Sequence, residues 1–410
     1  MTEHSKNVTP KALNGVLVLD LSRILAGPTA TQLLGDLGAT VLKIENPRTG
    51  GDDTRTWGPP YLETDDGNSD LSAYFMAANR NKFSVAADLS TTEGQALVKS
   101  IAGQAQIVLE NYKPGGLAKY GLDYDSLRKI NPGLVYCSIS GFGQTGPNRD
   151  QPGYDLMAQG FGGIMSITGE PDGAPMKAGV GIADVMCGMY ATVGMLAALR
   201  HAEATGEGQH IDISLVDSQM AWLINEGTNF LTSGKTPERR GNNHPNIVPY
   251  GVFLTKDGHI ILAVGNDSQF QAFCNAFGRK DLAEDERFAT NPLRIANREA
   301  IDAAITETFR DFDSRQIHEM LQVAKVPVGP IHSIPQALRS EQAVARDAVV
   351  RVPISGAASE TLELLGNPLK FSKTPVTYDK APPRFGEDTQ AVPEILAKHA
   401  GECSSRKGQK

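Results

Sequence analysis

Short apolar runs that alternate with helical stretches constrain the fold of residues 16–140 more than any other feature of this chain. Two stretches, 28–37 and 92–102, have the apolar spacing of helices, and Pro28 suits the first position of the earlier one. Five runs have the length and composition of buried strands: 16–21, 40–45, 83–88, 106–111 and 134–139. This alternation predicts an α/β fold, in which a parallel sheet carries helices on both faces.

The turn after the first predicted strand limits the cofactors that we expect this fold to bind. It reads SRILAGP over residues 22–28 and lacks the Gly-x-Gly-x-x-Gly spacing that brings the backbone close to a dinucleotide pyrophosphate. We therefore expect neither a nicotinamide nor a flavin cofactor.

Charge and composition exclude further classes of partner. With 410 residues, 40% hydrophobic and 21% charged, the chain is long enough for two domains with an ample core. Its formal net charge of -8 argues against nucleic acid or an anionic membrane as the main partner, although a local basic groove can still bind a polyanion. The nearest approach to a membrane span, 185–199, is too short in sequence.

The cysteines give no sign of a metal site. Cys137, Cys187, Cys274 and Cys403 are scattered, with no Cys-x-x-Cys pair and no paired histidines. Isolated cysteines favour a reducing, cytoplasmic compartment. Residues 1–14 are polar and mixed in charge, unlike a signal or transit peptide.

The pattern beyond residue 200 predicts a second, smaller domain. A helical stretch at 217–232 leads to a basic, polar segment at 235–246, and two strand-like runs, 250–254 and 259–264, flank a Lys-Asp-Gly turn. We expect four parts: a large α/β domain at 1–224, a small domain at 225–330, a return to the large domain at 331–400, and a disordered tail at 401–410.

A single aspartate, Asp184, ends a long glycine-rich approach and precedes a run of small, helix-forming residues at 185–200. Glycines allow the backbone to approach a ligand closely. A carboxylate at a helix start faces unpaired N–H groups and the positive end of the helix dipole, which should keep it ionised and fixed, as a nucleophile requires. Asp is also a preferred N-cap residue, so the segment alone favours a purely structural interpretation.

Several further motifs, each weak alone, occur in an order and spacing that resemble the class III coenzyme A transferases (CaiB/BaiF type) over nearly the whole chain. Residues 51–60, GDDTRTWGPP, are similar to the succinyl-CoA–glutarate branch of that family. The other motifs are GVLVLDLSRILAGP at 15–28, GDLGA at 35–39, VLKIE at 41–45, NRNK at 79–82, ENYKPG at 110–115, SGFGQTGP at 140–147 and APPRFG at 381–386.

This resemblance implies a Rossmann-like large domain that binds coenzyme A, a smaller α+β domain, and an interlocked homodimer in which each chain threads a ring formed by the other. It also implies an activity. Coenzyme A would move from an acyl-CoA, here expected to be succinyl-CoA, to a small carboxylic acid, expected to be dicarboxylic, with no metal involved.

The resemblance assigns catalysis to Asp184, whose counterpart attacks the thioester carbonyl to form a mixed anhydride. Asp155 lies close to the nucleophile in relatives, although an ordinary helix-start carboxylate explains it equally well. Positions that match coenzyme A-binding residues of the family are Ile24, Leu25, Ala26, Ala87, Asp88, Leu89, Ser90, Asn111, Tyr112, Lys113 and Lys119. Asn46 departs from the family, because some relatives have a basic residue there.

Recognition of the distal carboxylate of a dicarboxylic acid is assigned to arginines, because a guanidinium pairs with a carboxylate through two parallel hydrogen bonds. The leading candidates are Arg55 and the loop residue His244, followed by Arg80, Arg239 and Arg240. Each of these side chains separately is also explained as a solvated surface charge.

Two alternative functions remain at this point. Racemases of the same family carry a histidine where this chain has Tyr154, and a phenol with a reference pKa of about 10 abstracts protons poorly near neutrality. An acyl-CoA racemase or isomerase is therefore disfavoured. A coenzyme A-binding protein without turnover is the second alternative, and an intact Asp184 argues against it.

Overall fold

The computed structural model describes residues 10–64, 67 and 69–407. The chain divides into two compact units. The large unit comprises Met1–Gly163, Ala178–Leu223 and Glu341–Lys410, and the small unit comprises Ile164–Lys177 and Ile224–Ser340. Two segments expected in the large domain, Ile164–Lys177 and residues 331–340, thus belong to the small unit.

The main sheet of the large unit has six parallel strands in the described part of the chain, in the order β3-β2-β1-β4-β5-β6. The sequence predicted five of them and missed the edge strand β6. Their bounds are β1 (Leu17–Asp20), β2 (Thr40–Glu45), β3 (Lys82–Ala86), β4 (Ile107–Glu110), β5 (Val135–Ser140) and β6 (His210–Ser214). This is the strand order of Rossmann sheets, so the α/β prediction is confirmed.

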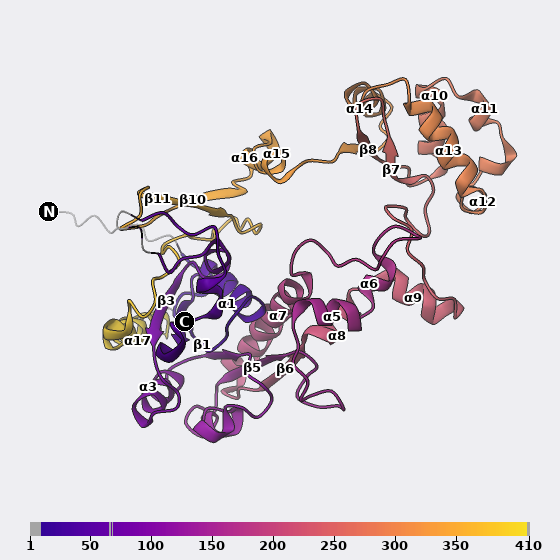
Figure 1. Ribbon diagram of the computed structural model, residues 1–410. Coiled ribbons are helices and arrows are strands. Elements are labelled where there is room, and N and C mark those ends of the chain that lie inside the picture. The colour runs from indigo at the N-terminus through magenta and orange to yellow at the C-terminus, as the bar shows by residue number, and fades with distance from the viewer. Residues whose placement is uncertain (1–9, 65–66, 68, 408–410) are drawn as a thin grey trace. The chain divides into compact units, whose positions relative to one another are not determined.

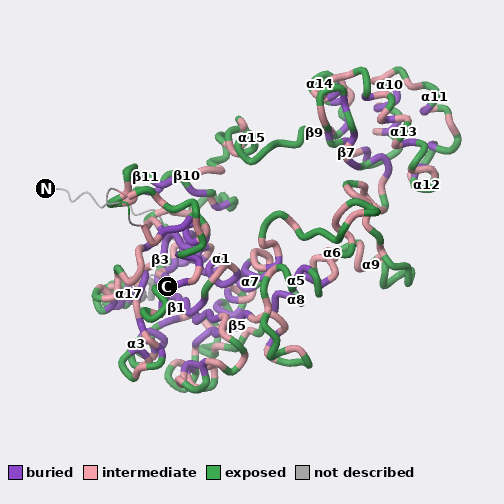
Figure 2. Tube along the Cα trace, in the orientation of Figure 1, coloured by how far each residue is buried: buried purple, intermediate pink, exposed green. Residues whose placement is uncertain are grey.

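Helices cover both faces of this sheet (Figure 1). On one face α1 (Ala26–Asp36) and α7 (Ile182–Thr205) pack on each other and on the strands. On the other face, apolar side chains of α3 (Thr92–Ala102) and α17 (Val392–Lys407) join a second core. Figure 2 shows buried residues concentrated on the strands between these helices.

The ends of the first two helices follow from local sequence. α3 has the predicted bounds, because the Thr91 hydroxyl accepts a hydrogen bond from the Gly94 N–H and caps the helix. The sequence had predicted Pro28 as the first residue of α1. The helix begins at Ala26, so Pro28 is its third residue. Pro28 still lies in the first turn, where its missing N–H leaves no intrahelical hydrogen bond unmade.

Helix α7 is longer than the sequence had predicted. At 24 residues it is long and apolar enough to cross a membrane by length and composition alone. Such helices also occur at the centre of soluble proteins, and α7 packs against α1, β5 and β6. Gly188 permits the close approach, since a Cβ there would lie 2.5 Å from the Ala26 carbonyl oxygen.

The predicted helix at 217–232 is broken. α8 (Leu215–Ala221) ends before Trp222, and α9 (Ile224–Ser233) begins at a residue with a φ of 43°. The chain passes from the large to the small unit at this break.

The remaining large-unit elements are α2 (Ala73–Ala77), α4 (Tyr124–Leu127), α5 (Asp155–Phe161), α16 (Glu341–Ala345), the antiparallel pair β10 (Val349–Pro353) and β11 (Thr361–Leu365), and the 3-10 turns η1 (Pro47–Thr49), η2 (Asp53–Thr56), η3 (Ala118–Tyr120) and η5 (Thr389–Ala391).

The small unit combines an antiparallel sheet, in the order β7-β8-β9, with short helices around a phenylalanine-rich core. The hairpin predicted around the Lys-Asp-Gly turn is present as β7 and β8. The elements are α6 (Ile164–Ile167), β7 (Tyr250–Leu254), β8 (His259–Ala263), α10 (Asp267–Ala276), α11 (Lys280–Ala283), η4 (Glu286–Phe288), α12 (Asn291–Ala296), α13 (Arg298–Phe309), α14 (Ser314–Val323), β9 (Val328–Pro330) and α15 (Ile334–Leu338).

The C-terminal segment differs from its prediction. Helix α17 continues to Lys407, so the tail expected to be disordered from residue 401 is helical over 401–407. Residues 408–410 lie outside the described part of the chain. Val392 and Leu396 attach the helix to the second core of the large unit, which the composition of the last ten residues does not reveal.

Candidate active site

The strand order reverses between β1 and β4, which makes this the topological switch point of the sheet. The chain runs outward from β1 in one direction and from β4 in the other, and Rossmann-type sheets bind ligands beyond the carboxyl ends of the strands at this point. The turn after β1 and the loop after β4 are joined there. The Asn111 amide accepts a hydrogen bond from the Arg23 N–H at 2.9 Å and donates one to the Arg23 carbonyl at 2.8 Å.

The residues predicted to bind coenzyme A follow β1, β3 and β4, so they lie at this same edge. Ile24, Leu25 and Ala26 follow β1, and residues 87–90 follow β3. The Asp88 carboxylate accepts hydrogen bonds from Arg48 at 2.6 Å and from Ser90. Arg48 thus supplies a cation close to Asn46, where some relatives have a basic residue.

The remaining predicted coenzyme A-binding residues belong to the loop after β4. Tyr112 is half-buried, whereas Lys113 and Lys119 are exposed. The Arg23 guanidinium lies over the Tyr112 ring, 5.9 Å from its centroid. Asn111 differs from the others, because the hydrogen bonds to Arg23 engage both ends of its amide, so its side chain links the two loops.

Asp184 is the third residue of α7, and Gly181 occupies the N-cap position. The simple N-cap interpretation of Asp184 is therefore wrong. Its half-buried side chain lies in the first turn, where backbone N–H groups lack intrahelical partners. Leu25, from the turn after β1, borders the same place: a Cβ built on Gly181 would lie 3.1 Å from a Leu25 methyl carbon.

Asp155, the first residue of α5, supplies the cap that Gly181 lacks. Its carboxylate accepts hydrogen bonds from the N–H groups of Ala183 at 2.8 Å and Asp184 at 3.3 Å. Gln159, one turn later on α5, donates to the other oxygen at 2.7 Å and accepts from the Ala178 N–H. A second carboxylate is thus held beside Asp184 by α5.

The protonation of Asp184 differs from what the helix position had suggested. Burial, followed by the negative charge of Asp155, raises the pKa of Asp184 to about 7. The helix dipole, typically worth less than about 1 kcal/mol, does not outweigh these two effects. Asp184 is consequently poised near neutrality rather than firmly ionised.

One aromatic residue near Asp184, Tyr74, escaped the sequence prediction of site residues. Burial, followed by the charges of Asp184 and Asp155, raises the pKa of Tyr74 on α2, which indicates that its hydroxyl lies within electrostatic reach of both carboxylates. The Trp57 ring, 43% exposed, packs edge-on against Tyr74 with centroids 5.1 Å apart. Nothing in the sequence singles out Tyr74.

The structure corrects the assignment of Arg55 as a substrate-carboxylate receptor. Its side chain is buried, and its guanidinium meets acceptors on all three nitrogens: both oxygens of Glu45, the Asp70 carboxylate and carbonyl, and the Pro383 carbonyl. The guanidinium also stacks 3.8 Å from the Phe75 ring centroid. With every N–H group occupied, Arg55 has no donor for a substrate.

The other candidate arginines also have internal partners. Arg80 is buried and pairs with both oxygens of Asp36, with a third hydrogen bond to the Leu365 carbonyl. In the small unit, Arg239 donates to the carbonyls of residues 170, 171 and 173, and Arg240 pairs with Glu226 at 3.2 Å. Arg80 and Arg239 therefore hold the chain's own segments together.

The two remaining predicted substrate residues have different surroundings. Tyr154, 62% exposed, precedes α5 and makes no side-chain cap to it. His244 belongs to the small unit, where its ring packs on Tyr250 and its Nδ1 accepts the Asn246 N–H at 3.1 Å.

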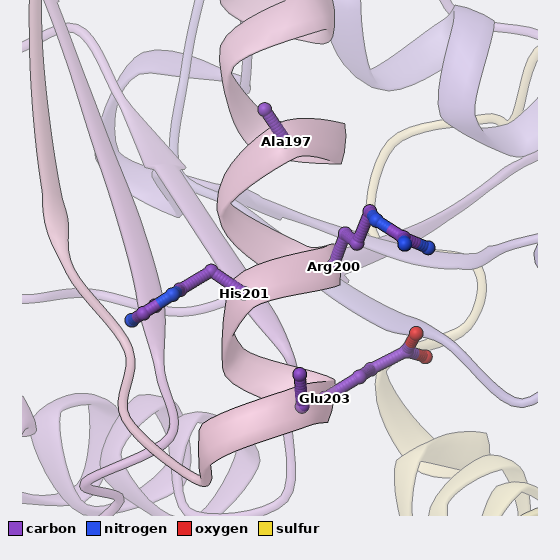
Figure 3. A pocket seen from close by; sticks show the side chains of 5 residues that line it. Ala197, Arg200, His201 and Glu203 are labelled. Carbon is purple, nitrogen blue, oxygen red and sulfur yellow. The ribbon is translucent and has the colours of Figure 1, made fainter.

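A cavity beside the C-terminal part of α7 lies away from the candidate site. About 480 Å³ of space adjoins the C-terminal part of α7, where Arg200 and His201 point in different directions (Figure 3). Arg200 is sixteen positions after Asp184, which corresponds to about 24 Å along a helix. Among the described residues, no group of His, Cys, Asp or Glu has the arrangement of a metal site.

A smaller cavity of about 180 Å³ lies under the loop after β4. Glu110, Ser138 and His210, from three adjacent strands, line it. Ser138 Oγ and His210 Nε2 are 2.9 Å apart, and Glu110 accepts the Tyr112 N–H at 2.7 Å. Burial raises the pKa of Glu110 to about 7, so this carboxyl is partly protonated at neutral pH.

Comparison with known proteins completes the description of the site. The family model described as CoA-transferase family III matches residues 13–389. A succinate–glutarate CoA-transferase of Agrobacterium fabrum is 49% identical over 380 residues, which cover 93% of this chain and 94% of that protein. A succinyl-CoA:glutarate CoA-transferase of Mus musculus is 38% identical over 384 residues, 93% of this chain and 86% of that protein.

Solved structures agree with this match. A crystal structure of a CAIB/BAIF family protein from Brucella suis superposes with a TM-score of 0.83 at 44% sequence identity. The alignment covers 94% of this chain and 99% of that one. Both the α/β fold and the small unit are therefore features of a known architecture.

Proposed function

Since the chain belongs to CoA-transferase family III, and is a class III CoA-transferase, we propose that it moves coenzyme A from succinyl-CoA to a small dicarboxylic acid through an anhydride on Asp184. The observation that carries this proposal is the position of Asp184. A half-buried carboxylate starts α7 beside the Leu25 turn, and a second carboxylate, Asp155, fixes the helix start. The large unit supplies both halves of this arrangement.

The chemistry follows from a carboxylate nucleophile. An Asp184 oxygen attacks the thioester carbonyl carbon, the carbon–sulfur bond breaks, and the coenzyme A thiolate leaves with the electron pair. The thiolate or the acceptor carboxylate then attacks the Asp184 acyl carbon of the anhydride, whose C–O bond breaks to release the donor acid. The thiolate route gives an Asp184 thioester, from which the acceptor carboxylate displaces the thiolate, so both routes lead to an anhydride between Asp184 and the acceptor. The thiolate finally attacks the acceptor's acyl carbon, which gives the new thioester and restores the Asp184 carboxylate. A serine or cysteine acyl-enzyme would leave a carboxylate acceptor unactivated, whereas an anhydride conserves the energy of the thioester.

Substrate choice is inferred from the relatives. The Agrobacterium and mouse proteins are named for succinate or succinyl-CoA and glutarate, which are dicarboxylic. We propose the same class of acceptor here, and we propose the coenzyme A site at the edge formed by residues 24–26, 87–90, 111–113 and Lys119. Neither Arg55 nor Arg80 is available to read the distal carboxylate, so we no longer assign it to them.

We also propose a homodimer in the cytoplasm. Helix α7 carries exposed apolar side chains at Met189, Tyr190 and Val193, the last 65% exposed, and such a surface on a central helix favours coverage by another chain. Cys137 and Cys187 are buried free thiols, which supports a reducing compartment.

The test is isotope exchange followed by trapping. The native protein should move label from free succinate into succinyl-CoA, and hydroxylamine should convert Asp184 of the acyl-enzyme to a hydroxamate that mass spectrometry locates. Asp184→Asn should lose more than about 10³-fold of the exchange rate, on the order of 4 kcal/mol, while coenzyme A binding persists. Full exchange in Asp184→Asn would exclude the covalent mechanism.

The same preparation separates the alternatives. Deuterium uptake at the α-carbon of a 2-methylacyl-CoA at a rate comparable to transfer would identify a racemase, despite Tyr154 in place of histidine. Coenzyme A binding without exchange of label into any acid would identify a binding protein.

A further inference from the structure

The turn between β1 and α1 is held by side chains at nearly every backbone group. Asp20 accepts the Ser22 N–H at 2.9 Å, and Lys43 Nζ donates to the Ser22 carbonyl at 2.8 Å. Asn111 binds both the N–H and the carbonyl of Arg23. Asp52 accepts the Ile24 N–H at 3.3 Å. Such complete anchoring fixes a short turn in a single conformation.

That conformation is an unfavourable one. Ile24 has a φ of 72°, in the left-handed region, where its β-branched side chain crowds the backbone. A residue persists there only when its surroundings impose the geometry, and such residues concentrate at functional sites. Ile24 precedes Leu25, which borders Gly181 at the start of the helix that carries Asp184. The strained residue therefore adjoins the candidate nucleophile's helix.

Asp52 and Lys43 form a buried ion pair under this turn. Lys43 Nζ lies 2.9 Å from Asp52 Oδ2, and both side chains are fully buried. Burial alone would raise the pKa of Asp52, but the charge of Lys43 lowers it below its usual value, so the pair is ionised. Each partner also binds the turn, Lys43 at Ser22 and Asp52 at Ile24.

We propose that Asp52, through its ion pair with Lys43, is a positioning residue that holds Ile24 in its left-handed conformation and so shapes the turn that receives the acyl-CoA. This inference rests on the proposed function, because it takes the turn to be part of the coenzyme A site. Asp52 does not touch the reacting atoms. It acts on them through Ile24 and Leu25.

Asp52→Asn isolates this role. The amide oxygen of the variant can keep the two hydrogen bonds that Asp52 Oδ1 accepts from Thr54. Its amide nitrogen replaces the oxygen that faces Lys43, so the ion pair is lost, and the Ile24 N–H keeps only Oδ1 of its two acceptors, at 3.3 Å. We expect the KM for acyl-CoA to rise on the order of tenfold, with a change in kcat below about threefold and an unchanged KM for the acid.

Ile24→Gly supplies the second arm of a double-mutant cycle. Glycine adopts a positive φ without strain, so the turn no longer depends on Asp52 to impose it. In the Ile24→Gly background, Asp52→Asn should raise the KM for acyl-CoA by less than about threefold. An equal rise in both backgrounds, or none in the Ile24 background, would overturn the proposal.

A matched control separates positioning from stability. Asp36→Asn breaks another buried ion pair of the large unit, with Arg80, away from this turn. It should lower the thermal midpoint without altering the KM for acyl-CoA. If Asp52→Asn alone does not fold, the double variant must fold and must bind acyl-CoA like Ile24→Gly alone, or the proposal fails.

Calorimetric titration with coenzyme A keeps the test separate from the proposed function. It reports the state of the turn in all variants even if no transfer occurs. A native protein that binds coenzyme A without transferring it would contradict the proposed function alone, and a Kd unaffected by Asp52→Asn would contradict the positioning role alone.

Discussion

The carboxylate of Asp155 accepts a hydrogen bond from the backbone N–H of Asp184 and, by its charge, contributes to the raised pKa of the Asp184 side chain. One residue thus fixes the helix that carries the candidate nucleophile and also sets part of its acidity. The arrangement links position to protonation, because removing the Asp155 side chain would change both. It also explains how a carboxylate at a helix start acquires a pKa of about 7 despite the favourable dipole.

The first prediction is a rate that rises with pH. Only ionised Asp184 can attack a thioester, and burial with the Asp155 charge places its pKa at about 7. In a single turnover with saturating succinyl-CoA, release of the coenzyme A thiol should therefore increase through pH 7 and level off above it. A rate already at its plateau at pH 5 would contradict the raised pKa.

Neutralising Asp155 should shift the rising limb of the pH–rate profile, the pH range over which the rate increases. Asp155→Asn removes the like charge but retains an oxygen for the Ala183 N–H, so the pKa of Asp184 should fall and the rising limb should shift to lower pH. Asp155→Ala, which also removes the cap, serves as the comparison and should in addition lower kcat at pH 8. An unchanged limb in Asp155→Asn would show that burial alone sets the acidity.

We expect Arg55 to stabilise the fold and not to bind the substrate. Arg55→Met leaves the buried Glu45 carboxylate without its bidentate partner, and removing one member of a buried ion pair costs about 3–5 kcal/mol. Urea unfolding should show this loss. The exposed pair of Arg315 and Glu319 provides the control, since Arg315→Ala should leave the unfolding free energy nearly unchanged.

The same variant tests the interpretation made from sequence. If Arg55→Met stays stable but loses its preference for dicarboxylic over monocarboxylic acceptors, Arg55 reads the substrate after all. We expect any folded fraction of the variant to keep that preference.

Arg55 also illustrates what a sequence can and cannot predict here. The strands were predictable because parallel strands buried on both faces form continuous apolar runs, as in Leu17–Asp20 and Ile107–Glu110. The edge strand His210–Ser214 alternates polar and apolar residues and gives no such run. Whether an arginine is solvated or saturated depends on distant partners such as Pro383, which local patterns do not reveal.

The site was predictable only in part for the same reason. Asp184 stood out through its glycine-rich approach and its family resemblance. Its protonation depends on burial and on Asp155, 29 positions away, which only the packing of α5 against α7 brings near. Tyr74 carries no motif of its own and becomes visible only through its electrostatic proximity to Asp184.

A fourth prediction concerns stability and Glu110. Burial raises the pKa of Glu110 from 4.5 to about 7 in the folded protein, so the folded state binds more protons than the unfolded state between these values. Stability should therefore fall as pH rises from about 4.5 to about 7, and stay low above that. Over this window the loss is about 3 kcal/mol at most.

Glu110→Gln removes this contribution. The variant should be less pH-dependent than the native protein, and the difference between their urea unfolding free energies should change mainly between pH 4.5 and 7. Glu207→Gln, at an exposed carboxylate, is the control and should follow the native curve. Parallel curves for the native protein and Glu110→Gln would refute the assignment.

The last prediction concerns Tyr74. Burial and the charges of Asp184 and Asp155 raise its pKa, so its hydroxyl stays protonated within electrostatic reach of two carboxylates. Negative charge also develops on oxygen when Asp184 attacks a thioester, and a fixed O–H dipole stabilises such charge. Tyr74→Phe keeps the ring that packs on Trp57 and removes only the hydroxyl. We expect kcat to fall on the order of tenfold, about 1.4 kcal/mol, with an unchanged thermal midpoint. Tyr61→Phe is the control: it changes an exposed tyrosine whose hydroxyl donates a hydrogen bond to the Thr56 carbonyl, and it should leave kcat unaltered. Equal rates for Tyr74→Phe and the native enzyme would mean that Tyr74 only packs against Trp57. The charge on the reacting oxygen would then be stabilised by other groups, such as the N–H groups at the start of α7.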